Sequence, residues 1–528
     1  MEIFQPTHRK FLREDCIDVI ARTQLWDIIV IGGGASGLGI ALDAVTRGYK
    51  TLLVEQSDFA KGTSSRSTKL VHGGVRYLAQ GNIQLVREAS IERGRLLHNA
   101  PHLVKDLAFV LPVYSLFERL KYLIGLKIYD RLAGKYRMGP SVFISQKQAM
   151  EKLPGIKSEK LKGAIEYHDG QFDDARLAIN LVQTILEQGG IAINYMKVTG
   201  LLKNENKKIN GVSAEDLESG NKYDLSAKVV VNATGVFVDE ILKMDKPNHA
   251  KTISVSQGTH IILDKSFFPS SNALMIPKTS DGRVLFALPW HDNVIVGTTD
   301  EPVDEISLEP KPLEFEIDFI LETVGKYFAK KPTRQDVLSV FAGLRPLAAP
   351  KKTTQKTKEI SRGHQLLSSS SDLFTILGGK WTTYRKMGED MLDFIERKMN
   401  WTRRQCTTSS LAIHGADGHS DQHNPFYFYG SDFISLKKKI EADSDGWLSR
   451  KLNIHQAQIV WAVEFEMART VEDILARRSR ALFLDAAEAR SIAPQVAIIM
   501  SRLLRKDENW EKQQIEKFNQ LAGNYLLK

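Results

Sequence analysis

Three glycines near the amino terminus, Gly32, Gly34 and Gly37, have the spacing of a dinucleotide-binding turn. They form the pattern G-x-G-x-x-G directly after the apolar run 26–31, which is typical of a buried parallel strand. Gly32 permits the tight turn, Gly34 lets the backbone approach a pyrophosphate, and Gly37 lets the next helix pack closely on the strand. The positive end of that helix then faces the phosphates. The pattern predicts a dinucleotide site but does not distinguish FAD from NAD.

A carboxylate follows this turn at a suitable distance. The next predicted strand ends in Glu55, 23 positions after Gly32. An acid at the end of the second strand accepts hydrogen bonds from ribose hydroxyls. The alternative is a glycine-rich turn in an ordinary strand–helix–strand unit, but the strand, turn, helix and acid occur together here, which favours the dinucleotide site.

Two later turns indicate which dinucleotide is bound. The apolar run 229–232 ends in Ala233, Thr234 and Gly235, as expected for a strand that returns to the same sheet and passes the bound dinucleotide. This arrangement resembles the two-domain flavoproteins of the D-amino-acid-oxidase-like class. The segment 377–380, which contains Gly379, then leads into a predicted helix that begins at Trp381. A helix amino terminus aimed at a flavin would stabilise negative charge on the reduced ring.

One long segment carries a more specific resemblance. Residues 63–78, TSSRSTKLVHGGVRYL, resemble the signature of FAD-dependent glycerol-3-phosphate dehydrogenases. The pieces GTTD at 297–300, GLRP at 343–346 and GGKWTTYR at 378–385 resemble the same family in order, and 466–480 resembles its C-terminal domain. The resemblance covers about residues 26 to 500. It implies FAD as cofactor, oxidation of sn-glycerol 3-phosphate to dihydroxyacetone phosphate by hydride transfer, and electron delivery to membrane quinone.

The resemblance also implies roles for individual residues. Further cofactor contacts are expected at Thr63, Ser64, His72, Gly73, Gly74, Gly379, Lys380 and Thr382. Substrate contacts are expected at Arg76, Tyr77, Arg345, Arg362 and Lys380, of which Arg362 matches less securely because the preceding loop is rich in lysine.

The residue types support these expectations independently. A phosphomonoester carries roughly −1.5 to −2 charges at pH 7, and planar guanidinium groups bind its oxygens bidentately. Arg345 precedes Pro346, which favours an extended backbone and a fixed side chain. A base must take the C2 hydroxyl proton. Histidine is the usual base near neutral pH, and His260 is our first choice because the resemblance implies that it lies in the pocket. Arg345 is grouped with it as catalytic, whereas His72 is expected to pack against the flavin.

The length and composition of the chain indicate its broad structural class. The chain has 528 residues, 42% hydrophobic and 26% charged, which fits a folded protein of roughly two to four domains. Strand and helix patterns alternate to about residue 395, so we expect an α/β fold with a Rossmann-like FAD-binding domain and an antiparallel-sheet substrate region. The predicted divisions are a lead at 1–25, the interleaved FAD-binding and substrate domain at 26–399, a linker at 400–425 and an all-α domain at 426–528.

The net charge and the number of cysteines limit the partners and metal sites that we expect for this chain. The net charge of +9 fits an anionic substrate, an anionic membrane surface or nucleic acid. Two cysteines are too few for an iron–sulfur cluster or a thiolate zinc site, and we predict no metal. The polar amino terminus lacks the features of a secretory signal, and we expect no membrane span. The protein is therefore expected in the cytoplasm, at the inner face of the cytoplasmic membrane, as a homodimer.

A peripheral enzyme that reduces membrane quinone needs a surface that binds the membrane. Residues 116–137 predict a basic amphipathic helix, which suits an anionic lipid interface. Its apolar stripe consists of Phe117, Leu120, Ile124, Ile128 and Leu132. The alternative, an ordinary surface helix that packs this stripe on the core, fits the pattern equally well.

Three other functions compete with this interpretation. A glycerol-3-phosphate oxidase would keep the fold and the substrate but use O2. A dehydrogenase subunit with a separate iron–sulfur partner is also compatible with the cysteine count. A flavin-binding RNA-modifying or regulatory protein would use the positive charge, but the chain lacks a recognisable RNA-binding module, so no nucleic acid is expected as a partner.

Overall fold

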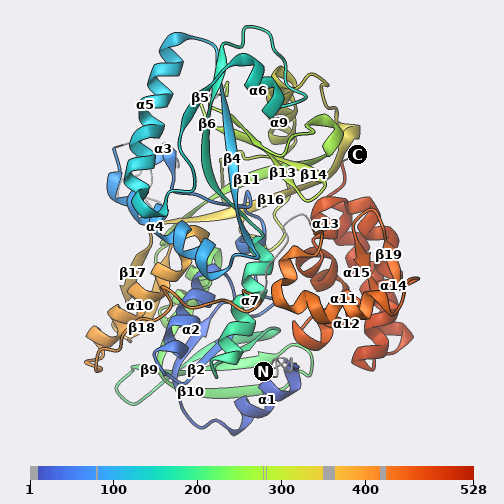
Figure 1. Cartoon of the computed structure of the whole chain (residues 1–528). Coiled ribbons are helices and arrows are strands. Elements are labelled where there is room, and N and C mark those ends of the chain that lie inside the picture. The colour runs from blue at the N-terminus through green and yellow to red at the C-terminus, as the bar shows by residue number, and fades with distance from the viewer. Residues whose placement is uncertain are drawn as a thin grey trace, which may run out of the picture.

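The computed structural model describes residues 10–527 except 79–80, 278, 281, 349–362 and 417–423. Two sheets lie one above the other in Figure 1, with a helical unit beside them. The chain passes repeatedly between the two sheets, so both belong to one interleaved unit.

The first sheet has a parallel centre. Its strand order is β17-β18-β10-β1-β2-β7, with β17 antiparallel at one edge. The bounds are β1 Trp26–Ile31, β2 Thr51–Val54, β7 Ile191–Ile193, β10 Lys222–Asn232, β17 Gln365–Ser368 and β18 Leu373–Leu377. The central strands are buried on both faces, as their continuous apolar sequences predict. A ribbon of β8 (Met196–Lys203) and β9 (Ile209–Asp216) continues from β10.

Helices pack together against this sheet. The fingerprint turn leads into α2 (Ala35–Thr46), which packs against α10 (Tyr384–Lys398) and α7 (Asp174–Glu187). Gly39 lets α2 and α10 approach closely, because a Cβ there would lie 2.3 Å from the carbonyl oxygen of Tyr384. The start of α10 is thereby fixed above the fingerprint turn.

The second sheet is mixed and mostly antiparallel. Its order is β15-β11-β14-β13-β12-β4-β6-β3, with β16 paired to β11 and β5 to β6. The bounds are β3 Leu70–Val71, β4 Val104–Val113, β5 Val142–Ile144, β6 Gly163–Phe172, β11 Ile253–Asp264, β12 Ala273–Ile276, β13 Leu285–Trp290, β14 Asn293–Gly297, β15 Glu301–Val303 and β16 Val337–Ala348. The associated helices are α3 Val75–Leu78, α4 Ile83–Asn99, α5 Leu116–Ala133, α6 Gln146–Lys152 and α9 Glu314–Tyr327. The helix α8 (Val238–Asp245) instead contacts β18 and β8 of the first sheet.

The carboxyl-terminal part is mainly helical. It contains η8 Tyr427–Asp432, α11 Phe433–Glu441, α12 Gln456–Phe465, η9 Asp473–Arg478, α13 Ala481–Leu484, α14 Ala486–Leu504 and α15 Glu508–Gly523. The sequence predicts an all-α domain here, but β19 (Trp447–Ser449) and β20 (Ile454–His455) form a small antiparallel pair. These strands are too short to show a period-two pattern, which is why the sequence does not reveal them.

The predicted amino-terminal lead also contains a helix, α1 (Arg13–Arg22). Arg13 anchors it, because its guanidinium donates to Asp216 at 2.7 Å and to the carbonyl oxygen of Asn194. Across the described part of the chain, no helix is both long and apolar enough to cross a membrane.

Candidate active site

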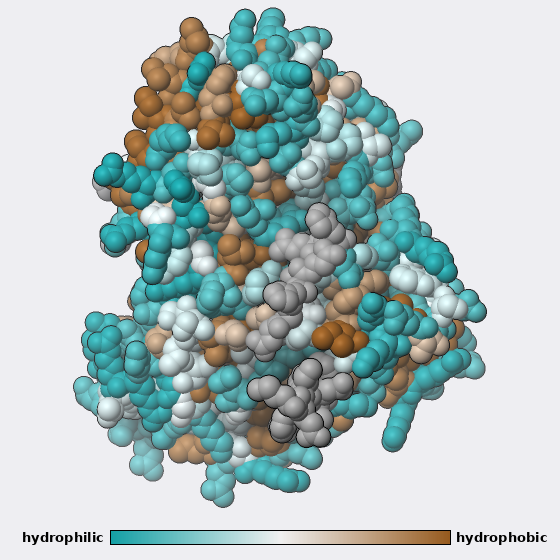
Figure 2. Space-filling model, in the orientation of Figure 1, coloured by the Kyte–Doolittle hydropathy of each residue, from teal (hydrophilic) through white to brown (hydrophobic). Residues whose placement is uncertain are grey.

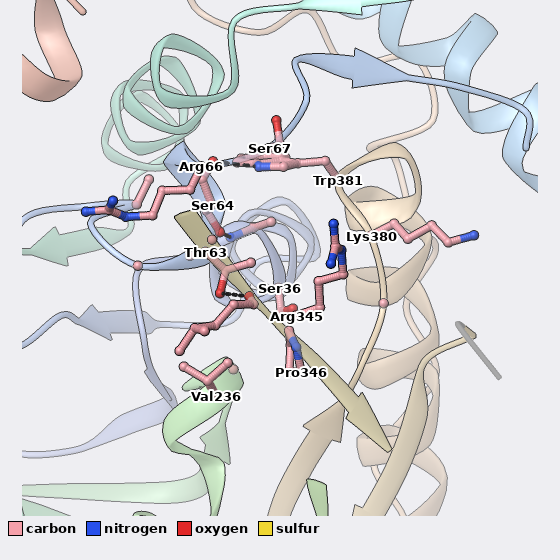
Figure 3. A pocket seen from close by; sticks show the side chains of 18 of the residues that line it. Ser36, Thr63, Ser64, Arg66, Ser67, Val236, Arg345, Pro346, Lys380 and Trp381 are labelled. Atoms are coloured by element: carbon pink, nitrogen blue, oxygen red, sulfur yellow. Dashed lines mark hydrogen bonds between the residues drawn. The ribbon is translucent and has the colours of Figure 1, made fainter. Parts of the chain in front are cut away.

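A large pocket is lined by residues of both sheets. Its walls come from the fingerprint turn, the segment after β2, the end of β10, β11, β16 and the start of the helix after β18. Figure 3 shows Arg345 and Lys380 on this wall together with the Thr63–Ser64 turn. Most of the predicted site residues therefore meet in one cavity.

The fingerprint glycines are required by close backbone packing. Gly32 has φ +112°, and a Cβ on it would lie 2.7 Å from the carbonyl oxygen of Ala233. A Cβ on Gly37 would lie 1.8 Å from the carbonyl oxygen of Gly32. Gly34 caps α2 and leaves space beside the hydroxyl of Ser64. Gly32 and Gly34 line the pocket, and Gly37 lies beneath it as a packing position.

Glu55 is held at the end of β2 by backbone donors. The N–H groups of Gly33 and Ser57 donate to its two carboxylate oxygens at 2.7 and 2.9 Å. Burial raises the pKa of Glu55, and these two N–H groups oppose that rise. The carboxylate lines the pocket, where it can accept hydrogen bonds from ribose hydroxyls.

Another part of the pocket wall is built by the turn after β18. Gly378 and Gly379 have φ of +69° and +96°, the left-handed region that favours glycine, and the helical turn 381–383 follows at once. The indole N–H of Trp381 donates to the carbonyl oxygen of Ser64 at 2.8 Å, a contact drawn in Figure 3. The hydroxyl of Thr382 accepts from the backbone N–H of His72 at 3.2 Å. These bonds join the two predicted cofactor-binding segments.

The pocket lining therefore fits FAD. A glycine turn at a helix amino terminus and a ribose-type carboxylate line one part of it. The start of a second helix lines another part, where its positive end would stabilise a reduced flavin ring. The remaining predicted cofactor residues on the pocket wall are Thr63, Ser64, His72, Gly74, Ala233, Thr234, Gly235, Gly379, Lys380 and Thr382.

Gly73 departs from the expected cofactor contacts. It is absent from the pocket wall, and its N–H donates to the Asp169 carboxylate at 3.2 Å. A Cβ on Gly73 would lie 2.3 Å from the hydroxyl of Tyr129, and Arg93 pairs with Asp169 at 2.6 Å. Glycine is needed at this position because the chain passes over a buried polar cluster.

Arg345 is fixed by several acceptors. Its guanidinium donates to the carbonyl oxygens of Gln257 and Thr299 at 3.1 and 3.0 Å, and it pairs with Asp300 at 3.2 Å. Gly258 leaves room for it, because a Cβ there would lie 2.1 Å from the guanidinium. The side chain remains 24% exposed toward the pocket, so the charge is oriented and accessible.

Lys380 and Tyr77 meet on the same wall, with the ammonium 4.0 Å from the centre of the phenol ring. Arg76 lies beside Tyr77 in α3, where only its backbone is described. Arg362 lies outside the described residues.

His260 lies on β11 with its ring stacked on Phe341 at 4.9 Å between centroids. Its Nε2 is 2.9 Å from the hydroxyl of Thr68. Burial lowers the pKa of His260 well below its ordinary value, and the nearby charges of Arg345 and Lys69 add to the effect. The imidazole is therefore neutral at physiological pH, as a proton acceptor must be.

Several pocket residues are not among the sequence candidates. They are Ser36, Arg66, Ser67, Thr68, Phe109, Tyr167 and Phe286. Ser67 and Thr68 fall inside the long segment 63–78, which is the signal that could have identified them. The aromatic residues lie within ordinary strands, and their sequence pattern matches a packed core.

The fold and the pocket define the chain as an FAD-dependent oxidoreductase of the D-amino-acid-oxidase-like type. A family model for FAD-dependent oxidoreductases matches residues 27–383. A second model, for the C-terminal domain of alpha-glycerophosphate oxidase, matches residues 406–514. These matches confirm the predicted fold class and the predicted cofactor.

Similarity to individual proteins identifies the family more specifically. A probable mitochondrial glycerol-3-phosphate dehydrogenase of Caenorhabditis elegans is 39% identical, over 96% of this chain and 74% of its own. The crystal structure of the glycerol-3-phosphate dehydrogenase from Bacillus halodurans, complexed with FAD, is 30% identical with a TM-score of 0.79, covering 98% of both chains. The protein belongs to the glycerol-3-phosphate dehydrogenase family, as the sequence resemblance implies.

A third relative shares the fold alone. The L-alpha-glycerophosphate oxidase of Mycoplasma pneumoniae is 14% identical with a TM-score of 0.55, covering 74% of this chain and 98% of its own.

Proposed function

We propose that this protein oxidises sn-glycerol 3-phosphate to dihydroxyacetone phosphate, with electrons passing through FAD to membrane quinone. The observation that carries the proposal is the presence of Arg345, Lys380 and His260 in the lining of the same pocket. Two cationic side chains suit a phosphate, and a neutral imidazole suits a hydroxyl proton. The dehydrogenase relatives support the same substrate and disfavour the RNA-modifying alternative.

Each side chain then has a distinct task. Arg345 and Lys380 hold the phosphate, while Tyr77 packs against the Lys380 ammonium and limits its movement. His260 takes the proton from the C2 hydroxyl as the C2 hydrogen leaves with its electron pair. FAD, when bound, would supply the redox chemistry as the hydride acceptor. Loss of one proton and one hydride converts the alcohol to the ketone.

The helix α5 supports docking on an anionic membrane. Its stripe residues Phe117, Leu120, Ile124 and Ile128 are between 46% and 75% exposed, and only Leu132 is half-buried. The helix packs on the core with its other face, which carries Leu126 and Tyr129. Figure 2 shows the resulting apolar patch over α5. This orientation favours the lipid-facing interpretation over a stripe that packs on the core.

Basic side chains accompany the patch. Lys121, Lys127 and Arg131 are exposed on the same helix, and they suit lipid head groups beside a shallowly inserted apolar stripe. A bilayer-dissolved quinone would then reach the enzyme from the surface on which it docks. We further propose a homodimer at the inner face of the cytoplasmic membrane.

The test is an anaerobic absorbance spectrum of the purified protein before and after addition of sn-glycerol 3-phosphate. Bleaching of the flavin bands within seconds, and faster return with a soluble quinone analogue than with air, is the expected result. Faster return with air would favour the oxidase alternative. Flavin bands that do not change when this substrate is added would overturn the assigned substrate but not the assignment of the fold.

A further inference from the structure

The segment 55–69 wraps around the pocket with little regular structure of its own. It contains only the short helical turn η1 (Thr63–Ser65) between β2 and β3. Ala60 and Lys69 have φ of +59° and +62°, a left-handed conformation that non-glycine residues keep only when their surroundings hold them. Something outside the segment must therefore maintain its shape.

The carboxyl-terminal domain supplies ion pairs and a hydrogen bond to this segment. We call the contacting residues, Glu472, Arg477, Arg478 and Arg480, the C-terminal clamp. They lie on or beside η9, within the stretch 466–480 that resembles the family's C-terminal domain.

The first contact is at Asp58, three residues after Glu55. Arg477 donates to its carboxylate at 2.5 Å, and Arg478 donates to both of its oxygens. All three side chains are nearly inaccessible to solvent. Burial alone would raise the pKa of Asp58, but the two guanidinium groups outweigh burial and hold it below its ordinary value. Asp58 is therefore a charged, fully enclosed anchor.

Two more contacts follow along the segment. Glu472 pairs with Lys61 at 2.8 Å. Arg480 donates to the carbonyl oxygen of Ser65 at 3.1 Å and to Asp174 at 3.0 Å. Asp174 in turn accepts from the hydroxyl of Ser67 at 2.7 Å and from Lys69. The clamp thus holds the segment at its beginning, middle and end.

The held residues lie among the residues that form the pocket, and Lys61 belongs to both sets. Glu55, Thr63, Ser64 and Thr68 line the cavity, and the N–H of Ala60 donates to the carbonyl oxygen of Gly33 in the fingerprint turn at 3.0 Å. A displacement of Asp58 would therefore move the ribose-type carboxylate and the turn beside the fingerprint together.

We infer that the C-terminal clamp is a positioning device for the cofactor: it fixes segment 55–69 in the shape that binds FAD, through Asp58, Lys61 and Ser65. Breaking one partner of a buried ion pair leaves an uncompensated charge and is costly. Retention of FAD then depends on a domain that contributes no residue to the pocket wall. The inference concerns the cofactor alone and is independent of the identity of the substrate.

The experiment compares two nearly isosteric variants of the holoenzyme, Asp58→Asn and Glu466→Gln. Glu466 is a matched control, because it pairs with Arg176 at 2.7 Å across the same domain interface, and both side chains are fully buried away from the pocket. FAD release into FAD-free buffer is followed by the recovery of flavin fluorescence. We expect release to accelerate at least tenfold in Asp58→Asn and less than threefold in Glu466→Gln.

Equal acceleration in the two variants would overturn the inference, because it would show general loosening of the interface. Unchanged release in Asp58→Asn would overturn it as well. If Asp58→Asn does not fold, Arg477→Lys keeps the charge but loses the planar fork, and at least threefold faster release is expected. The KM for sn-glycerol 3-phosphate at saturating FAD should stay within twofold of the parent value, which separates a failure here from a failure of the proposed substrate.

Discussion

The hydroxyl of Thr68 lies 2.9 Å from Nε2 of His260, so a residue of the long segment 63–78 contacts the proposed base on the second sheet. Nδ1 of the same ring is buried and has no hydrogen-bond partner in the described protein. The Thr68 hydroxyl is therefore the contact that orients the imidazole, and the direction of this hydrogen bond follows the tautomer of the ring.

Replacing Thr68 with valine should slow the reaction without releasing the cofactor. Loss of a hydrogen bond to a buried group costs about 1–2 kcal/mol, so kcat should fall about tenfold. Thr68→Ser keeps the hydroxyl and should stay within threefold of the parent. Steady-state kinetics with an FAD absorbance ratio for each variant provides the measurement. Equal losses in the two variants would assign Thr68 a packing role instead.

The decrease of kcat at low pH should reflect the unusual environment of His260. The neutral ring is the active form, and its pKa is lowered well below the ordinary value by burial and by the charges of Arg345 and Lys69. Protonation is therefore postponed to lower pH, and kcat should not fall between pH 8 and 6.5 in the parent. We use kcat because the free substrate phosphate itself titrates near pH 6. His260→Asn should lose kcat while it retains bound flavin, and parent-like turnover would remove His260 as the base.

Arg345 should be sensitive even to a conservative change. Arg345→Lys keeps the charge but loses the planar guanidinium that contacts Gln257, Thr299 and Asp300. Charge-assisted hydrogen bonds are worth about 1.5–3 kcal/mol, so we expect KM for sn-glycerol 3-phosphate to rise at least about tenfold. FAD content should not change. A parent-like KM with normal FAD content would exclude Arg345 from phosphate binding.

The sequence predicts features that are local along the chain and misses those that are not. The roles of Gly32 and Gly37 follow from one strand–turn–helix unit, and their close packing distances agree with the prediction. By contrast, Thr68 and His260 are 192 positions apart, and Asp58 and Arg477 are 419 apart. No periodicity or motif connects such residues, because only the tertiary fold brings them together. The sequence likewise does not decide whether the α5 stripe faces the surface or the core, because it does not show which face of the helix packs.

Membrane binding should depend on the exposed stripe of α5. Phe117→Ser with Leu120→Ser removes two side chains that would each gain about 1.5–3 kcal/mol on full burial in lipid, so vesicle binding should weaken at least tenfold. Ile434, 64% exposed on α11, provides a matched control as Ile434→Ser. Sedimentation with phosphatidylglycerol vesicles at low salt provides the measurement, and reversing Lys121 and Lys127 to Glu should also abolish binding. Unchanged sedimentation in these variants would exclude α5 as the docking element.

Stability should fall at alkaline pH because of His414. Its Nδ1 lies 2.5 Å from Glu187 and its Nε2 lies 3.0 Å from Asp432, so the ring joins α7 to η8. Burial opposes protonation, but the two carboxylates outweigh it and raise the pKa of His414 to about 10. A pKa raised on folding stabilises the protein fully below about pH 6.5, and this stabilisation is lost as the pH rises toward 10. Because Glu187 is partly exposed, screening should limit the loss to about 1–2 kcal/mol. The urea midpoint should therefore fall between pH 6.5 and 9.5 more steeply in the parent than in His414→Gln, and parallel profiles would contradict a charged His414.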